Sequence, residues 1–482
     1  MGLGTKLIKN TGYLTIGNQV GNLLQFLFFL YFARTFGEVI VGQYSFAFSF
    51  TYMFSVFADL GLSTYLIREV ARDRAEGREI FARCLSLRLF SIAVSLLLAV
   101  AAILVFSRDL SSDTILIIVL LGLFQVFFSI ADVFLGEFKG HDRMGTVALL
   151  NVFIRFVLSI AGMFLILMRF DFITVLSCFP IASFIYLITC ICLSYYYFGN
   201  FKHHIRNLHI KSLFIKTLPF TFTIIFAESL YHQDILMLKF LKDDQAVGVF
   251  SVANAIVLAL MSIIVFVHTA MLPTFSLLYV DSKSKLIDIS KESLRYLLFI
   301  GLPIATGLFA ISEKLILFLF SDSFEYSVTV LRTLSWTIFF GFAATTYSVL
   351  LTAINRQTKK VIVIGICLAF NFMLNLILIP MLSYNGAAAA KLATEALHFI
   401  LMAYFVSKYL TSISIHRVFI KPALSSFFMY LFIQYFIQWS LVYLIPVSAF
   451  VYLFSFGAMR GYSREEIEFV KRLHPKMLLR GG

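Results

Sequence analysis

The chain has 482 residues, of which 60% are hydrophobic and only 13% are charged. Soluble globular domains average about 45–50% apolar and about 25% charged residues, so this composition excludes a soluble enzyme, a nucleic-acid-binding module and a disordered protein. The apolar runs are continuous rather than alternating, which argues against a β-barrel. The composition therefore predicts an all-α polytopic membrane protein.

The number of spans follows from the apolar runs. A membrane-spanning helix needs about 20 mostly apolar residues, and about fourteen such helices account for the apolar share of the chain. The weakest boundary between runs is at Gln438, Trp439 and Ser440. Because fourteen is even, both termini are expected on the same side of the membrane. The predicted spans in chain order are 13–35, 42–66, 86–106, 114–137, 146–168, 172–197, 217–240, 246–272, 295–319, 327–354, 361–381, 384–407, 418–438 and 440–458.

The net charge of +13 lies in short loops between these spans, which indicates membrane orientation rather than nucleic-acid binding. Alternate loops and the C-terminal tail carry most of the 39 basic residues, whereas the other loops are short and acidic. The positive-inside rule then predicts a cell-membrane protein with both termini and all basic loops in the cytoplasm. The basic loop after the second span, for example, contains Arg68, Arg72, Arg74, Arg78, Arg83 and Arg88.

Two parts of the chain are similar at a constant offset of 206 residues, the distance from Gly42 to Gly248. At this offset Val41, Gly42, Ser45 and Ala47 recur as Val247, Gly248, Ser251 and Ala253. Six spans separate the copies, so both halves have the same orientation, and parallel repeats of this kind enclose a site between them. The sequence therefore predicts four parts: a six-helix bundle (1–200), its repeat (201–410), two additional helices (411–458) and a basic cytoplasmic tail (459–482).

Polar residues line one face of the first and seventh predicted spans. Steps of three, four or seven residues keep each set on a single helix face. For the Thr, Asn and Gln residues, a water-accessible cavity between the halves and hydrogen bonding between helices are both open interpretations. For Glu228 and His232 we favour the cavity. The first set is Thr11, Thr15, Asn18, Asn22 and Gln25, and the second is Thr217, Thr221, Glu228, His232 and Lys239.

Arg155 lies near the middle of the fifth span, too deep to reach the membrane surface easily. It needs either an anionic partner or a wet cavity, and Asp132 and Glu137 on the fourth span are the candidate partners.

The other ionisable residues within the spans can have either a structural or a functional role. Asp234 lies off the polar face of the seventh span, where we expect it to pair with a cation. Lys391 and Glu395 are four residues apart and are expected to pair with each other. Three residues near span ends, Arg34, Asp59 and Arg68, are either interface anchors or the rims of a transport path.

The sequence carries no signature of an enzyme. We find no phosphate-binding glycine loop, no metalloprotease motif and no nucleophile elbow. The five cysteines show no metal-ligand spacing. We therefore expect no cofactor, no metal site and no catalytic residue, so that an ion gradient, a substrate gradient or a partner supplies any driving force.

Three segments carry a resemblance to a known family. YFARTFGEVIVGQYSFAFSF and FADLGLSTYLIREVAR resemble the N-terminal signature of Wzx-type polysaccharide-biosynthesis flippases, in the multidrug/oligosaccharidyl-lipid/polysaccharide (MOP) superfamily. FNFMLNLILIPMLSYNGAAAAKLATEAL is similar to the eleventh and twelfth helices of that family. This last segment departs from the family at Ser383, Tyr384 and Asn385, where a glycine usually follows the proline closely.

The resemblance implies a MATE-like pair of six-helix bundles around a central cationic cavity. It implies flipping of a polyprenyl-(pyro)phosphate-linked oligosaccharide from the cytoplasmic to the outer leaflet for surface polysaccharide or glycoconjugate synthesis. On this reading Arg155, with Arg34, Arg68 and Lys239, holds the phosphates. The expected sugar contacts are Thr15, Asn18, Asn22, Gln25 and Thr221, and the candidates for ion coupling are Glu228, His232, Asp59 and Asp234.

Two alternatives stay open at this point. One is a drug or metabolite antiporter of the multidrug-extrusion type, which dye efflux would separate from glycan export. The other is a membrane scaffold that transports nothing and recruits a glycosyltransferase through its basic loops. The expected partners are membrane lipid, the polyprenyl-linked substrate, and glycosyltransferases or a polymerase of the same pathway, with no nucleic acid.

Overall fold

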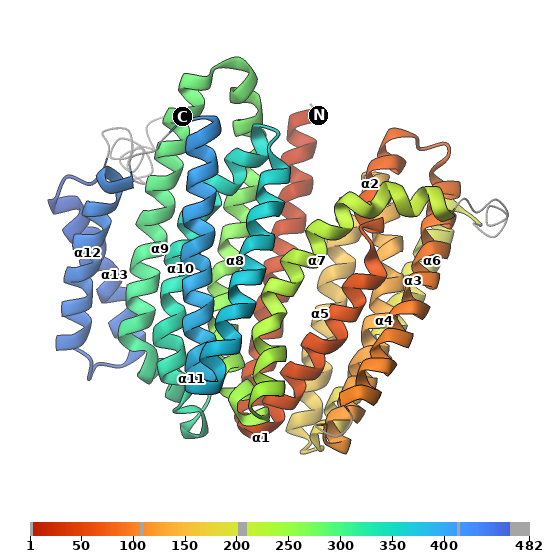
Figure 1. Ribbon diagram of the computed structural model, residues 1–482, viewed down its shortest axis with the longest axis horizontal. Helices are drawn as coiled ribbons and strands as arrows, with labels where there is room; N and C mark the ends of the chain where they lie inside the picture. Colours follow the sequence, from red (N-terminus) through yellow and green to blue (C-terminus); the bar gives the residue numbers. More distant parts are fainter. Residues whose placement is uncertain (1–2, 107–109, 201–209, 412–414, 463–482) are drawn as a thin grey trace, which may run out of the picture. The chain divides into compact units, whose positions relative to one another are not determined.

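The computed structural model describes residues 3–106, 110–200, 210–411 and 415–462. Within these ranges it describes side chains except at 3–16, 18, 210–220, 222–223, 265–266, 269–270 and 415–417. The described chain is helical (Figure 1). Its helices are α1 (Leu3–Asp59), α2 (Leu62–Arg72), α3 (Gly77–Phe106), α4 (Ser112–Gly140), α5 (Met144–Leu167), α6 (Phe172–Phe198), α7 (Ile210–Leu241), α8 (Asp244–Asp281), α9 (Lys283–Leu319), η3 (Asp322–Phe324, a 3-10 helix), α10 (Ser327–Ala353), α11 (Gln357–Tyr409), α12 (Ile415–Tyr435) and α13 (Leu441–Ala458).

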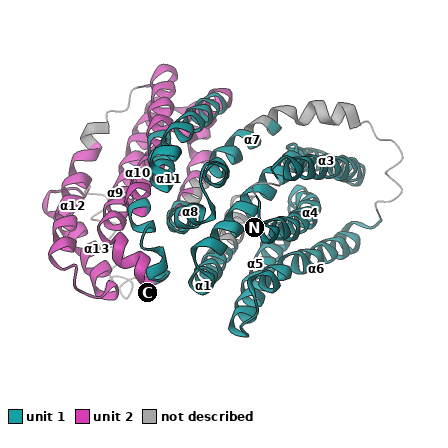
Figure 2. Ribbon diagram, turned by 60° about the horizontal axis from the view of Figure 1, so that its bottom comes forward, with its two compact units in different colours: residues 1–262, 319–330, 361–394 teal, residues 263–318, 331–360, 395–482 magenta. Residues whose placement is uncertain are grey.

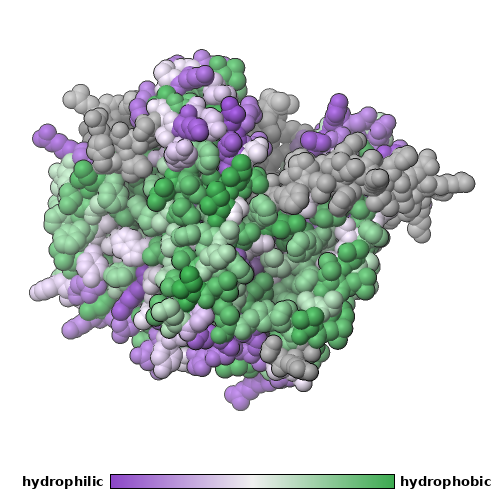
Figure 3. Space-filling model, in the orientation of Figure 1, coloured by the Kyte–Doolittle hydropathy of each residue, from purple (hydrophilic) through white to green (hydrophobic). Residues whose placement is uncertain are grey.

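Eleven helical segments of the described chain are long and apolar enough to cross a membrane. Two of the longest helices, α1 and α11, each contain two predicted spans separated by a kink. Each of the fourteen predicted spans falls mainly on a described helix, which is compatible with the predicted count. Figure 3 shows hydrophobic side chains along the middle of the helices and hydrophilic ones toward their ends, as a membrane-embedded protein requires.

The two kinks have a backbone cause. Gly37 in α1 has φ 77° and ψ 179°, a conformation that is accessible mainly to glycine. Ser383 in α11 has φ 52° and ψ −134°, an unusual conformation for a residue with a Cβ atom. This is also the position at which the sequence departs from the pattern of the family that it resembles. The chain therefore makes its second sharp turn with a serine where a glycine would be less strained.

The second predicted span, 42–66, is too long. Helix α1 ends at Asp59 because Leu60 and Gly61 both adopt positive φ angles, and the separate helix α2 starts at Leu62. The apolar residues of α2 concealed this break, because Leu62, Tyr65 and Leu66 continue the hydrophobic run. In the structure they are buried.

Side-chain caps begin two helices that follow the loops predicted to be external. The Ser111 hydroxyl accepts a hydrogen bond from the Thr114 backbone N–H at 3.2 Å, which begins α4. Asp171 caps α6 in the same way through Thr174. The hydrogen bonds from the side chain and backbone of Thr174 hold the pKa of the Asp171 carboxyl below its usual value.

The described chain divides into two compact units (Figure 2). Unit 1 comprises residues 1–262, 319–330 and 361–394, and unit 2 comprises 263–318, 331–360 and 395–482. This division differs from the predicted one, since unit 1 also includes α7 and parts of α8 and α11. The predicted boundary between two six-helix bundles at residue 200 stays a prediction. Of the predicted tail (459–482), the part after residue 462 lies outside the described residues.

In unit 1, helix α1 packs against α5, α4 and α3, and α4 packs against α6. Aromatic side chains fill much of this core. Phe28 of α1 contacts Phe179 of α6 with ring centroids 5.7 Å apart, and Phe124 of α4 contacts the same ring at 5.6 Å. Phe32 of α1 is fully buried. These contacts fix the relative positions of the helices that carry the polar residues described below.

The two repeated segments cross each other within unit 1. A Cβ atom at Gly42 would collide with the backbone carbonyl oxygen of Asp244, and one at Gly248 would collide with that of Glu38. Both contacts are related by the repeat, because Gly42 corresponds to Gly248 and Glu38 corresponds to Asp244 at the same offset of 206. The absence of side chains lets the backbones of α1 and α8 touch, as small residues do in membrane helix pairs.

Unit 2 has its own core. Ile311, Met429, Ile433, Leu444 and Tyr452 form one buried cluster of α9, α12 and α13. The Tyr452 hydroxyl donates a hydrogen bond to the Phe299 carbonyl oxygen at 2.7 Å, which ties α13 to α9. Helices α12 and α13 are separated by a turn over 436–440, at the weak boundary that the sequence indicated.

Candidate functional site

Arg155 lies on α5 against the first part of α1. Its guanidinium Nη1 donates a hydrogen bond to the Asn22 side-chain oxygen. A Cβ atom at Gly21 would collide with the Arg155 side chain, so Gly21 provides the space in which the arginine lies. Gly17, one turn earlier, likewise faces Val152 of α5. The spacing Gly17–Gly21–Asn22 thus places a partly buried cation beside the polar face of α1.

The polar face of α7 meets the second part of α1. The His232 Nδ1 lies 3.1 Å from the Ser49 hydroxyl, and the His232 and Tyr52 rings lie 4.8 Å apart. Tyr52 also forms a hydrogen bond with the Glu228 carboxylate. Residues 49 and 52 on α1, and 228 and 232 on α7, are one helical turn apart, so two polar pairs stack along the same helix interface. No pattern in the sequence pointed to Ser49 and Tyr52, which lie in a run of aromatic residues.

Asp234 points away from that face, toward α11. It is fully buried, and its Oδ1 accepts a hydrogen bond from the Asn375 amide at 2.7 Å. The Lys391 ammonium lies 3.6 Å from its Oδ2 and donates to the Asn254 side-chain oxygen at 3.0 Å. The expected cation partner of Asp234 is therefore Lys391, and Asn254 of α8 completes the group.

Asp59 belongs to another polar group, formed by the end of α1 with α2, α3 and α4. The Arg88 guanidinium forms an ion pair with Asp59 and donates to the Ser63 hydroxyl at 2.8 Å. Arg88 Nη2 also lies 3.4 Å from Asp132 Oδ2, and Ser63 hydrogen bonds to both aspartates. The loop charges place Arg88 in a basic loop, but its side chain is only 2% exposed. Its position inside an apolar run was the signal that could have identified it.

Several pairings expected from the sequence are wrong. Glu137 pairs with Arg78 of α3 at 2.9 Å, not with Arg155. Asp132 is also not the partner of Arg155, since it joins the Arg88 group. Lys391 lies at Asp234, whereas the Glu395 carboxylate lies 3.6 Å from His398. In each case a residue on another helix or at another spacing is nearer than the expected partner.

The remaining candidates lie apart from these groups. Arg34 and Gln25 are exposed on α1, and Thr221 of α7 is buried. Arg68 is exposed and pairs with the neighbouring Glu69 at 2.8 Å. Lys239 forms an ion pair with Asp244 at 2.6 Å, at the junction of α7 and α8. The side chains of Thr15 and Asn18 lie outside those that the structure describes.

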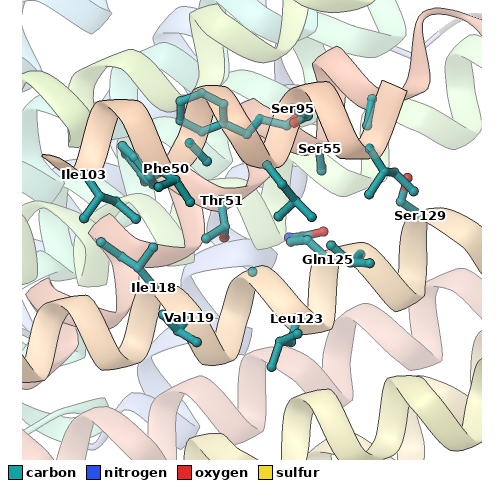
Figure 4. A pocket seen from close by; sticks show the side chains of 18 residues that line it. Phe50, Thr51, Ser55, Ser95, Ile103, Ile118, Val119, Leu123, Gln125 and Ser129 are labelled. Carbon is teal, nitrogen blue, oxygen red and sulfur yellow. The ribbon is translucent and has the colours of Figure 1, made fainter. Parts of the chain in front are cut away.

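A pocket of about 230 Å³ lies within unit 1 between α1, α3 and α4 (Figure 4). Its lining is mostly apolar, and Figure 4 shows Ile103, Ile118 and Val119 toward one end. The polar side chains of Ser55, Gln125 and Ser129 lie toward the other end. This pocket is distinct from the predicted cavity between the halves, which stays a prediction.

Comparison with known proteins gives the fold and the family. The structure is similar to the lipid II flippase MurJ in an inward closed conformation, with a TM-score of 0.76, 19% identity, and coverage of 92% of this chain and 98% of that one. It is also similar to an inward-facing multidrug resistance MATE transporter of the MOP superfamily, with a TM-score of 0.65, 15% identity, and coverage of 80% and 95%. These likenesses confirm the expected all-α, MATE-like architecture.

The sequence comparisons extend this result. A capsular polysaccharide biosynthesis protein, CapF, from Staphylococcus aureus is 25% identical over 417 residues, which cover 83% of this chain and all of that protein. Residues 7–278 match the model of the polysaccharide biosynthesis protein family. The two similar structures are named as a flippase and a multidrug transporter rather than as enzymes. The chain therefore belongs to the polysaccharide biosynthesis protein family, as a multi-pass membrane protein with the fold of the MurJ and MATE structures.

Proposed function

We propose that this protein moves a polyprenyl-(pyro)phosphate-linked oligosaccharide from the cytoplasmic to the outer leaflet of the cell membrane, by alternating access coupled to an ion gradient. Membership of the polysaccharide biosynthesis family supports a role in glycan export. The likeness to a lipid II flippase supports a substrate that is itself a lipid. The expected cytoplasmic termini fit a substrate that is assembled on the cytoplasmic side.

The position of Arg155 carries the proposal. A guanidinium in the middle of an apolar membrane helix is costly unless it meets water or an anion. Gly21 keeps space for it on α1, and the Asn22 side-chain oxygen accepts a hydrogen bond from it. Guanidinium groups bind phosphate oxygens in a bidentate geometry. Arg155 is therefore the residue that we expect to hold the phosphate of the substrate.

The neighbouring polar groups fit the other parts of such a substrate. Asn22 can hydrogen bond sugar hydroxyls on either its donor or its acceptor side, and we expect Thr15, Asn18 and Gln25 to do the same. Glu228 and His232, which contact α1 through Tyr52 and Ser49, are candidates for proton coupling because both can change charge. The polyprenyl chain requires no polar contact and can stay among lipid acyl chains.

The test is Arg155→Ala in the full-length protein, reconstituted in liposomes with a fluorescent polyprenyl-pyrophosphate-linked oligosaccharide. We expect the flipping rate to fall by about tenfold or more, since a charge-assisted bond to phosphate is worth about 1.5–3 kcal/mol. Arg155→Lys should keep part of the rate because it keeps the charge but not the planar geometry. Arg72→Ala, an exposed arginine in the last turn of α2, is the matched control and should flip at the wild-type rate.

Surface glycan in cells provides the second measurement. We expect Arg155→Ala to reduce it at an unchanged protein level. If the Arg155→Ala variant flips the substrate at the wild-type rate, Arg155 is not part of the substrate site. Dye efflux by a wild-type protein that flips no lipid-linked oligosaccharide would instead identify a multidrug-type antiporter.

A further inference from the structure

The pocket between α1, α3 and α4 (Figure 4) opens on an apolar surface of the protein. Leu96, Val100, Val119 and Leu123 line it, and these four residues are 43–52% exposed. They belong to α3 and α4, two helices that are long and apolar enough to cross a membrane. A molecule dissolved in the hydrocarbon of the bilayer can therefore enter the pocket without passing through water.

The volume of the pocket limits what can fill it. The pocket measures about 230 Å³. An apolar cavity of about 150 Å³ in a protein core accepts benzene, so this pocket has room for a ligand of about ten non-hydrogen atoms. A whole phospholipid is much larger than this volume.

Gln125 of α4 lines the pocket, and its side-chain amide has no hydrogen-bond partner in the part of the chain that the structure describes. The residue is only 5% exposed, and it lies midway along the predicted span 114–137. Figure 4 shows its amide among the other lining side chains. Because the bilayer core offers no water, an unpaired amide at this depth is unfavourable until a ligand pairs with it.

Other polar side chains of the lining already have partners. The hydroxyls of Thr51 and Ser55 donate to carbonyl oxygens of their own helix, each at 2.8 Å. The Ser95 hydroxyl of α3 donates to the Phe54 carbonyl oxygen of α1. These hydroxyl groups pack the helices together, whereas the Gln125 amide remains available to a ligand.

Ser129 lies one helical turn after Gln125, so the two side chains are on the same face of α4. Its hydroxyl oxygen accepts a hydrogen bond from Arg88 Nη1 at 3.3 Å, and its hydrogen has no acceptor among the described residues. Together the two residues offer an amide donor, a carbonyl acceptor and a hydroxyl donor. A ligand group that both donates and accepts, such as a hydroxyl or an amide, matches this set.

The charges beside the pocket favour a neutral ligand. Arg88 forms an ion pair with Asp59, and its guanidinium also lies 3.4 Å from the Asp132 carboxylate. Two carboxylates therefore already face this guanidinium. A third anionic group, such as the carboxylate of a fatty acid, would meet like charges at this end of the pocket and would lose its hydration as well.

We propose that this pocket binds a small neutral amphiphile that enters from the membrane. The apolar body of the ligand lies along Ile103, Ile118 and Val119, and its single hydroxyl or amide group bonds to Gln125 and Ser129. This site is separate from Arg155, and its ligand is not the substrate of the proposed function.

Photolabelling of the full-length protein in lipid nanodiscs tests the site. The probes are 1-octanol and octane that carry the same photoreactive diazirine, at equal mole fractions in the bilayer, and mass spectrometry locates the adducts. We expect octanol to label the lining segments 50–58, 92–103 and 118–129 about three- to tenfold more than octane does, since a buried hydrogen bond contributes about that factor. Equal labelling of these segments by both probes would show that any hydrocarbon chain fills the pocket, and would overturn the proposal.

Gln125→Met tests the hydrogen bond, because methionine has a similar length and no amide. We expect octanol and octane to label this variant equally. The control is Gln434→Met, which changes an exposed glutamine of α12 and should keep the wild-type preference for octanol. A preference for octanol that survives Gln125→Met would remove this amide from the site.

Gly122→Leu tests the location. A Cβ atom at Gly122, which lines the pocket, meets only the Thr51 methyl carbon at 3.8 Å, so a leucine has room to fill the pocket. We expect octanol labelling of the lining segments to fall by about threefold or more. Gly145→Leu on α5, where a Cβ atom meets nothing within 4 Å, is the matched control and should label like the wild type. Undiminished labelling in Gly122→Leu would place the ligand elsewhere and contradict the proposal.

Discussion

At the scale of single residues, the Asp234–Lys391 pair shows how a charge is accommodated inside this protein. The carboxylate is fully buried and the lysine side chain is 11% exposed, with their charged atoms 3.6 Å apart. Breaking such a pair leaves the remaining charge without compensation, which costs about 3–5 kcal/mol. The amides of Asn375 and Asn254 would not replace the missing charge.

We therefore expect Asp234→Asn and Lys391→Met to lower the free energy of unfolding strongly, each by about 3–5 kcal/mol. The double variant should recover a large part of that loss, because it removes both charges. Thermal unfolding of the purified protein in detergent measures all three. Lys291→Met is the control, since Lys291 and Asp288 form an exposed pair that contributes little. Additive losses in the double variant would show that the two charges do not stabilise each other.

The sequence identified the unusual residues better than their partners. Depth in an apolar run was enough to single out Arg155 and Asp234. The partners come from other helices, as Asn22 and Lys391 do, and spacing along one helix carries no information about them. For Lys391 the expected partner four residues later was wrong, because a fully buried carboxylate on α7 competes more strongly for its charge than the less buried Glu395 does.

At the scale of helices, apolar runs predicted the spans well and their ends less well. The kinks at Gly37 and Ser383 fall close to predicted boundaries, because each is a short interruption between two runs. The start of α2 was not predicted, since hydropathy does not record the positive φ angles of Leu60 and Gly61. The candidate groups were predictable where two polar stripes faced each other, and unpredictable where a turn such as Leu60–Gly61 brings Ser63 to Arg88.

The crossing of α1 and α8 gives a prediction at this scale. Gly42→Ala and Gly248→Ala should each lower the free energy of unfolding by about 1–3 kcal/mol, because the new methyl group meets a backbone carbonyl that cannot rotate away. The two losses should be similar, since the repeat relates the two contacts. Thermal unfolding measures them. Gly145→Ala on α5 is the control, because a Cβ atom there meets nothing within 4 Å.

An unequal pair of losses would contradict the symmetry of this crossing. A wild-type melting temperature in both variants would show that the backbones of α1 and α8 separate without cost. A higher stability of the Gly145→Ala control would not contradict the prediction, because alanine favours a helix more than glycine does.

At the scale of the whole chain, the repeat and the loop charges constrain each other. Copies in the same orientation require an even number of spans between them, and the alternation of basic and acidic loops requires the same count. The reciprocal contacts at Gly42 and Gly248 support the register of the repeat within unit 1. The membrane topology that these two constraints predict can be measured in cells.

Labelling of single cysteines in intact cells measures that topology. Ser284 lies at the start of α9, on the side expected to be cytoplasmic, and Ser323 lies in η3 before α10, on the side expected to be external; both side chains are exposed. In a Cys192→Ser background, which removes the exposed native cysteine, we expect a membrane-impermeant maleimide to label Ser323→Cys but not Ser284→Cys. Permeabilised cells should label both, which controls for reactivity. Labelling of Ser284→Cys in intact cells would show that the predicted orientation is inverted. The direction of the proposed transport relative to the basic loops would then be inverted too.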